Sequence, residues 1–394
     1  MKKVLFACLL LQTFLLHAQD ISVAMGPQFK LKDFDYRKTS TADKMGDFFY
    51  GMKYTQKRAH FGFTVRLDDL KIGIELTKSD AGMNVIKSVA MQNGQADFGP
   101  FPPRVKIFGN RVLLFFYKVQ PDGSIKLFVS DINNETLADA KAIDLYTFSQ
   151  KNVGLFSLES AYESNKLDFC LTPDSTKMLV ALSGTSNEIF SCLIDDNLAI
   201  TSSKVSVQKN NPNAVTINSA YIDKDGNRYF GYTYKLDKLL TSGVMINDSK
   251  GLDHYIPFSS AMPGSQGGDL LINGSNDNTK VYVYGGYKTG DLSKGVFLTT
   301  VDAARLTINR PVLFPYPDDV MENLRKLDFA YKSHGEFGIE NITYTFTDLE
   351  NGAVALTGYP YYTKQSVFTN STASVSYAGP VMAVIFKGGK AMRQ

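Results

Sequence analysis

The chain has 394 residues, of which 44% are hydrophobic and 21% are charged, with 31 glycines and 14 prolines. This composition is ordinary for a globular protein, so it excludes a disordered, collagen-like or coiled-coil chain. The 42 basic residues nearly balance the 39 acidic residues and no basic cluster stands out, so nucleic acid is not expected as a partner.

Residues 1–19 have the pattern of a secretory signal peptide: two lysines, an apolar stretch over 4–16 and the small residue Ala18. This stretch is too short to span a membrane, and no later apolar run reaches 18 residues. We therefore expect a mature chain over 20–394 without a transmembrane segment, secreted or periplasmic. Association with the outer membrane stays open, because the residues before Cys8 resemble a lipobox. The signal as a whole resembles those of Gram-negative envelope proteins, particularly in the Bacteroidetes.

Six units along the chain share one plan, in which two alternating apolar runs flank a short polar turn. Alternation interrupted by Asp, Asn and Gly is typical of antiparallel strands joined by tight hairpins. The turn markers Asp69, Asp122, Asp174, Asp225 and Asp277 follow one another at intervals of 53, 52, 51 and 52 residues, and Asn351 comes 74 residues later. The six predicted hairpins span 61–76, 112–129, 167–182, 218–234, 269–284 and 342–357.

A further short apolar segment follows each hairpin, so each unit holds three or four strands. A four-stranded sheet repeated every 40 to 50 residues or so is typical of a β-propeller. We predict an all-β fold, a six-bladed β-propeller that forms a single domain over 20–394. A β-sandwich and a β-solenoid are the alternatives.

The long last interval contains a segment of different character over 311–331. Three prolines are followed by Asp318-Asp319 and then by basic residues, with Val320, Leu324 and Leu327 on one helical face. The pattern predicts a short helical insertion between blades five and six. At the other end of the chain, residues 29–57 are expected either to supply a strand of the first blade or to close the ring against the last strand, 381–387.

Two of the turns resemble those of known propeller repeats. Leu171-Thr-Pro-Asp-Ser-Thr-Lys-Met-Leu179 and Gln120-Pro-Asp-Gly-Ser-Ile125 are similar to the Pro-Asp-Gly hairpin of TolB-like and WD40-like propellers. The likeness covers about ten residues per unit. It supports the fold and implies no functional residue.

Motifs for metal or nucleophilic catalysis are absent from the sequence. His60, His254 and His334 are scattered, and no metal ligand set or cofactor is expected. The turn Asp223–Asn227 lacks the flanking acids of a calcium loop and is expected to be a plain hairpin turn. Cys170 and Cys192 fall in strands two spacings apart, about 10 Å between Cα atoms, so we expect two free, buried thiols.

These observations favour a non-enzymatic binding or scaffold module with an unidentified protein or glycan partner. Aromatic, proline-rich connections are the expected binding loops, because loops carry function on rigid scaffolds. The predicted site residues are Phe101, Arg104, Phe258, Tyr316 and His334. The alternative function is a propeller hydrolase or lyase acting on glycans or peptides, with acids and His254 or His334 at the channel. A passive surface adhesin is a third reading.

Overall fold

The computed structural model describes residues 43–57, 71–82, 84–90, 103–120, 124–147, 167–183, 187–208, 215–236, 239–260, 266–267, 270–289, 292–318, 342–349, 352–368, 371–378 and 382–393. The predicted signal peptide, His60, Phe101 and His334 lie outside these residues. Among the described residues, no helix has the length and apolar character needed to cross a membrane.

The described chain is built almost entirely of antiparallel β-strands, which form six sheets in chain order. The first three sheets contain β1 (Asp43–Met45), β2 (Phe48–Lys57), β3 (Lys71–Ser79) and β4 (Val85–Ala90); β5 (Arg104–Phe108), β6 (Arg111–Val119), β7 (Ile125–Ile132) and β8 (Asp139–Thr147); and β9 (Leu167–Leu171), β10 (Lys177–Ser183), β11 (Glu188–Asp195) and β12 (Ile200–Val207).

The fourth sheet has the same plan, whereas the fifth and sixth have split or added strands. These sheets contain β13 (Val215–Ile222), β14 (Arg228–Leu236), β15 (Leu239–Asn247) and β16 (Asp253–Pro257); β17 (Gln266–Gly267), β18 (Leu271–Gly274), β19 (Val281–Thr289), β20 (Leu292–Asp302), β21 (Thr307–Ile308) and β22 (Val312–Pro315); and β23 (Ile342–Leu349), β24 (Ala353–Phe368), β25 (Ser371–Ala378), β26 (Met382–Lys387) and β27 (Lys390–Arg393). A 3₁₀ turn, Phe258–Ser260, follows β16.

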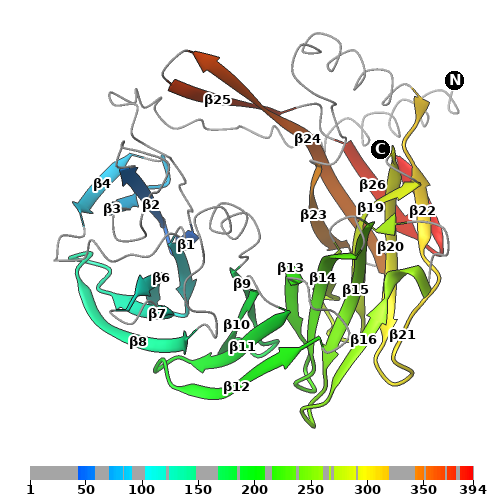
Figure 1. The fold of residues 1–394 in the computed structure, drawn as a ribbon, viewed down its shortest axis with the longest axis horizontal. Helices are drawn as coiled ribbons and strands as arrows, with labels where there is room; N and C mark the ends of the chain where they lie inside the picture. Colours follow the sequence, from blue (N-terminus) through cyan, green and yellow to red (C-terminus); the bar gives the residue numbers. More distant parts are fainter. Residues whose placement is uncertain are drawn as a thin grey trace, which may run out of the picture.

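The sheets stand around a common centre in a propeller-like arrangement. The first strand of each sheet lies toward the centre and the last strand toward the outside, as β9 to β12 and β13 to β16 show in Figure 1. Five clusters of buried apolar side chains fill the five spaces between consecutive sheets, from the first and second to the fifth and sixth. The core is therefore divided among the contacts between sheets.

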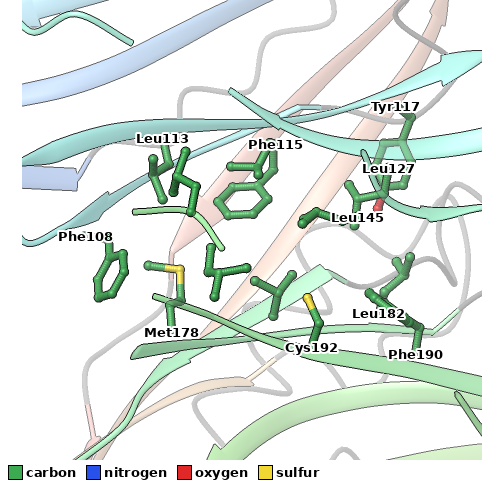
Figure 2. Close-up of a cluster of buried hydrophobic side chains, with 14 residues drawn as sticks. Phe108, Leu113, Phe115, Tyr117, Leu127, Leu145, Met178, Leu182, Phe190 and Cys192 are labelled. Carbon is green, nitrogen blue, oxygen red and sulfur yellow. The ribbon is translucent and has the colours of Figure 1, made fainter. Parts of the chain in front are cut away.

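Strand alternation explains how one strand serves two of these clusters. On β10, Val180 faces the second sheet, while Leu179 faces the fourth. Both side chains are fully buried, because the second strand of a sheet is covered on both faces. Figure 2 shows the cluster between the second and third sheets, with Phe115 and Cys192 among its members.

The connections of the sheets divide into two sets. In a four-stranded meander, the connections from the first to the second strand and from the third to the fourth leave the sheet at one end, which we call the turn face. The connection from the second to the third strand, and the one leading to the next sheet, leave at the other end, the loop face. In the fourth sheet, the side chain of Asn227 accepts a hydrogen bond of 2.9 Å from the amide of Ser249, which joins both connections of the turn face.

The structure describes only the start of the segment predicted as a helical insertion, so the helix itself stays a prediction. The first part of 311–331 is strand β22, which pairs with β20 as an outer strand of the fifth sheet. Val312 and Phe314 pack against the core, while Leu313 points outward, so the period is that of a strand. Pro315 is tolerated because β22 is an edge strand. Residues 319–331 lie outside the described chain.

The expectation that the N-terminal segment supplies a strand of the first sheet is confirmed for 43–57. Residues 43–57 supply β1 and β2, the inner two strands of the first sheet. The last strands, β26 and β27, pair with each other, and β26 also pairs with β24. Within the described residues, no strand of the first sheet pairs with them.

Candidate functional site

The structure places the three predicted site residues that it describes, Arg104, Phe258 and Tyr316, in different parts of the molecule. Arg104 is the half-buried first residue of β5, the inner strand of the second sheet, and its charge partly offsets the rise that burial causes in the pKa of Tyr117. Phe258 lies between the fourth and fifth sheets, and Tyr316 between the fifth and sixth. Phe101 and His334 fall outside the described residues, so their role stays a prediction.

Phe258 and Tyr316 are core residues. Phe258 is 1% exposed, and its ring centroid lies 4.6 Å from that of Phe297. Tyr316 is 7% exposed, and its hydroxyl forms a hydrogen bond with that of Tyr344. Burial raises the pKa of Tyr316 to about 12, so this hydroxyl stays protonated at neutral pH. Neither ring offers a free face to a partner.

His254 lies away from the centre of the ring, contrary to the expectation for a channel histidine. It belongs to β16, the outer strand of the fourth sheet, and its Nε2 lies 3.0 Å from Oδ2 of Asp248. That carboxylate also accepts hydrogen bonds from the amides of Leu252 and Lys250. The hydrogen bonds, the one from His254 first, lower the pKa of Asp248.

Polar side chains on the inner strands of three sheets connect each of these sheets to the next. The edge of an inner strand that faces the centre has backbone amides without partners in its own sheet. Asp43 accepts a hydrogen bond from the amide of Ile107 at 2.9 Å, and Ser219 accepts one from the amide of Ile272 at 2.7 Å. The carboxylate of Asp168 accepts one from the amide of Ala220 at 2.6 Å.

Asp168 also belongs to a polar cluster whose side chains come from the third and fifth sheets. It lies on β9 of the third sheet, and its Oδ2 contacts the inner strand of the fourth. Its negative charge also acts on the hydroxyl of Tyr284, which belongs to β19 of the fifth sheet. The side chain of Asn273, on β18 beside β19, forms a hydrogen bond with the same hydroxyl. We call Asp168, Asn273 and Tyr284 the axial cluster.

The environment of the axial cluster sets the protonation of Tyr284. Burial is the largest cause and the charge of Asp168 the second, and together they raise the pKa of Tyr284 to about 12 against the opposing hydrogen bond from Asn273. The hydroxyl therefore remains a proton donor at neutral pH. Asp168 is half-buried and Tyr284 is 6% exposed, so the cluster pairs a carboxylate with a phenol in a poorly solvated place.

The carboxylates of the turn face are occupied by their own turns. Asp223 accepts hydrogen bonds from the amides of Asp225 and Asn227, from the amide side chain of Asn227 and from the hydroxyl of Tyr229, all at 2.8–2.9 Å. This arrangement is a plain hairpin turn, as the sequence predicts. Among the described residues, no three His, Cys, Asp or Glu side chains gather as a metal site would require.

The two cysteines are free, as expected, but only Cys192 is buried and Cys170 is half-buried. Cys170, on β9, lies opposite Leu179 of β10, and Cys192, on β11, lies opposite Val180 of β10. The two thiols therefore point to opposite faces of the third sheet. Burial is the main cause that raises the pKa of Cys170 to about 11 and that of Cys192 to about 12. Both are therefore unreactive protonated thiols at neutral pH.

The sequence-based reasoning missed all three residues of the axial cluster. One signal was available for Asp168, which is the single charged residue in the apolar run 167–171. An acid inside a strand otherwise made of core residues needs a polar partner. Asn273 and Tyr284 carry no comparable signal, because their proximity to Asp168 depends on how three sheets are placed around the centre.

Comparisons with known proteins give structural neighbours only. No protein-family model and no curated protein matches the sequence. The polysaccharide lyase Uly1 aligns with 75% of this chain and 73% of its own, at 12% identity and a TM-score of 0.41. CoXyl43, a GH43 β-xylosidase/α-arabinofuranosidase from a compost microbial metagenome, aligns with 94% and 98% of the two chains, at 10% identity and 0.37. A glycosyl hydrolase from Bacteroides ovatus aligns with 70% and 87%, at 12% identity and 0.32.

The expected non-enzymatic binding or scaffold module is wrong in light of these neighbours. Their names describe enzymes that act on glycans, in agreement with the alternative reading of a hydrolase or lyase. Because the identities are 10–12% and the TM-scores are under 0.5, these neighbours do not assign an activity to this chain. The chemistry proposed below therefore rests on the axial cluster.

Proposed function

We propose that the chain is a six-bladed β-propeller enzyme, a hydrolase or lyase that cleaves glycan chains at the centre of the ring. The observation that carries the proposal is the axial cluster, in which the charge of the Asp168 carboxylate, on the third sheet, acts on the protonated Tyr284 hydroxyl, on the fifth. Asn273 completes the cluster with a side-chain amide suited to sugar hydroxyls.

Breaking a glycosidic bond requires one group that accepts a proton and one that donates it. In hydrolysis, Asp168 takes a proton from water as the water attacks the sugar, and Tyr284 gives its proton to the departing oxygen. In elimination, Asp168 instead takes a proton from the carbon beside a sugar carboxylate, a double bond forms, and the same oxygen leaves with the proton of Tyr284. The high pKa of Tyr284 keeps its proton available for either reaction.

The proposal includes the setting of the enzyme. Removal of residues 1–19 would release a single propeller domain over 20–394 outside the cytoplasm, where polysaccharides are met. Arg104, at the start of β5, is proposed to contact the glycan, and so are Phe101 and His334, which lie outside the described residues. Phe258 and Tyr316 are left out, because Phe258 has no group that transfers a proton and the Tyr316 hydroxyl is held by that of Tyr344.

The test compares three single variants on a panel of neutral and acidic polysaccharides. Asp168→Asn keeps an oxygen that can accept the hydrogen bond of Ala220, and Tyr284→Phe keeps the ring. Each is expected to lower kcat by about 10²-fold or more, the usual contribution of a proton-transfer group. Release of reducing ends measures both reactions, while the ultraviolet absorbance of an unsaturated product identifies elimination.

Tyr282→Phe is the matched control. Tyr282 lies on the same strand and face as Tyr284. Besides burial, it is the carboxylates of Asp348 and Asp277 that raise the pKa of its hydroxyl, not that of Asp168. Its loss should leave kcat unchanged. The proposal is overturned if the wild-type chain cleaves no polysaccharide of the panel, or if the Asp168 and Tyr284 variants are as active as the control.

A further inference from the structure

A cavity of about 590 Å³ lies at the outer rim, between the fifth and sixth sheets. It is formed by the start of β22 and by the β26–β27 hairpin, and Arg310, Leu313 and Lys390 are among its lining residues. β22 and β27 belong to the outer parts of their sheets, so this cavity is separate from the axial cluster. The cavity is open to solvent, so a sugar unit would lie on its surface and would not be enclosed.

The charge of the cavity is positive and uncompensated. Arg310 and Lys390 are both exposed, and neither side chain forms an ion pair or hydrogen bond with a residue that the structure describes. Among the described residues, none that lines the cavity is acidic. Two free cations beside one cavity favour a ligand that carries negative charge.

A third cation, Lys387, lies beside Lys390, and its charge destabilises the folded hairpin. The β26–β27 hairpin turns at Gly388 and Gly389, which have φ values of 57° and 74°, as a tight two-residue turn requires. Lys387 and Lys390 flank this turn and lie directly opposite each other. Like charges in that position destabilise a sheet, so folding alone does not account for them.

The apolar part of the lining limits the kind of anion that fits. Leu313 is 41% exposed and points outward from β22, beside Pro311 and Ala391. An inorganic anion would leave this apolar surface in water. A sugar ring that carries an acidic group has an apolar face for Leu313 and a charge for Arg310 and Lys390.

We propose that this cavity, the rim site, binds an acidic polysaccharide through carboxylate- or sulfate-bearing sugars. The assignment to a sugar chain rests on the proposed function, whereas the preference for an anion rests on the cavity alone. The rim site holds the polymer at the outside of the ring while the axial cluster acts on it elsewhere. It makes acidic glycans the substrate class.

The test measures binding in the Asp168→Asn chain, so that cleavage does not consume the ligand. The probes are polygalacturonate for carboxylates, dextran sulfate for sulfates, unmodified dextran as the neutral polymer and polyglutamate as an acidic peptide. We expect micromolar or tighter binding of one acidic polysaccharide and none of dextran. Arg310→Gln with Lys390→Gln should weaken that binding at least tenfold.

Lys224→Gln with Lys250→Gln removes the same charge from exposed positions in turns of the fourth sheet and should leave binding unchanged. Lys387→Gln should weaken binding, because it removes a cation beside the cavity. It should not lower the melting temperature, because it also removes the repulsion between Lys387 and Lys390. Equal loss of affinity in both double variants, or polyglutamate binding as tight as that of the polysaccharides, overturns the proposal. Binding without cleavage by the wild-type chain overturns the proposed function and leaves the rim site standing.

Discussion

Single carboxylates hold the turns that close the sheets. Asp277 accepts hydrogen bonds from the hydroxyl of Ser275 at 2.5 Å, from the hydroxyl of Thr279 at 2.7 Å and from the amide of Thr279 at 3.0 Å. These bonds favour the charged form and lower the pKa of Asp277 to about 2, with Lys280 as the smallest cause. The turn is thus stabilised by local hydrogen bonds to an anion.

Stability should fall in acid through Asp277. A depressed pKa adds stability above the ordinary value of 3.8, and that stability is lost as the pH falls toward about 2. Asp277→Asn should make the urea midpoint less dependent on pH between 4 and 2. Thr201→Ser, a neutral change at an exposed position of β12, is the control and should leave the pH dependence of the urea midpoint as in the wild type. A wild-type slope in the Asp277 variant as well would contradict this account.

At the scale of the residue, the sequence predicted the state of single side chains better than their place in the fold. The free cysteines and the plain turn at Asp223 were predictable, because strand spacing and ligand spacing are local properties. The site residues were not. An aromatic beside a proline has the same sequence signal whether it lines a site or fills the core, and Phe258 fills the core. Asp168 and Tyr284 are 116 positions apart in the chain and meet only through the arrangement of the sheets.

At the scale of the element, close packing at glycines fixes how neighbouring strands approach. A Cβ on Gly231, in β14, would lie 2.0 Å from the backbone oxygen of Leu270, which leads into β18. A backbone atom cannot rotate away as a side chain can. The fourth and fifth sheets therefore depend on this position having no side chain.

Gly231→Ala should destabilise the chain by about 2 kcal/mol or more, because the overlap forces the two sheets apart. Gly286→Ala is the matched control in β19. Its Cβ would have no neighbour closer than the Tyr344 hydroxyl at 3.7 Å, so its cost should stay within about 1 kcal/mol. Urea unfolding of the two variants measures the difference. Equal costs would show that the contact at Leu270 relaxes.

The predicted repeat was right in number and partly wrong in phase. Asp174, Asp225 and Asp277 mark connections between the first and second strands of their sheets. Asp69 and Asp122 instead fall between the second and third strands, after β2 and β6. The turns after β1 and β5, at Gly46 and Gly109, were missed. Equal intervals between Asp residues arise in either phase, because both connections of a meander need turn-forming residues.

At the scale of the whole molecule, alternation predicted six sheets and could not predict their closure. The all-β class and strand formation at 43–57 follow from patterns that each segment carries by itself, whereas the inner position of these two strands does not. Packing of a first sheet against a last one would depend on no such local pattern. In the described part of the chain, buried clusters join five consecutive pairs of sheets.

This division of the core predicts a gradient of protection from hydrogen exchange across each sheet. The side chains of β10 are buried from Met178 to Ser183, whereas most of those of β12 are exposed. Peptides from β10 should exchange far more slowly than peptides from β12, because opening β10 exposes two clusters. Mass spectrometry of exchanged, digested protein measures this. Equal protection of β10 and β12 would show that each sheet opens as one unit.

The side chains that link the inner strands also bear on how such a ring can change over evolution. Asp43, Asp168 and Ser219 each accept an amide of the following sheet, so part of what completes a sheet is encoded in the unit before it. A duplicated sheet carries the side chain that accepts an amide of the sheet after it. The acceptor for its own inner-strand amide must come from the sheet before it. The heritable module is therefore the junction between two sheets, and insertions that respect it must begin and end inside a sheet.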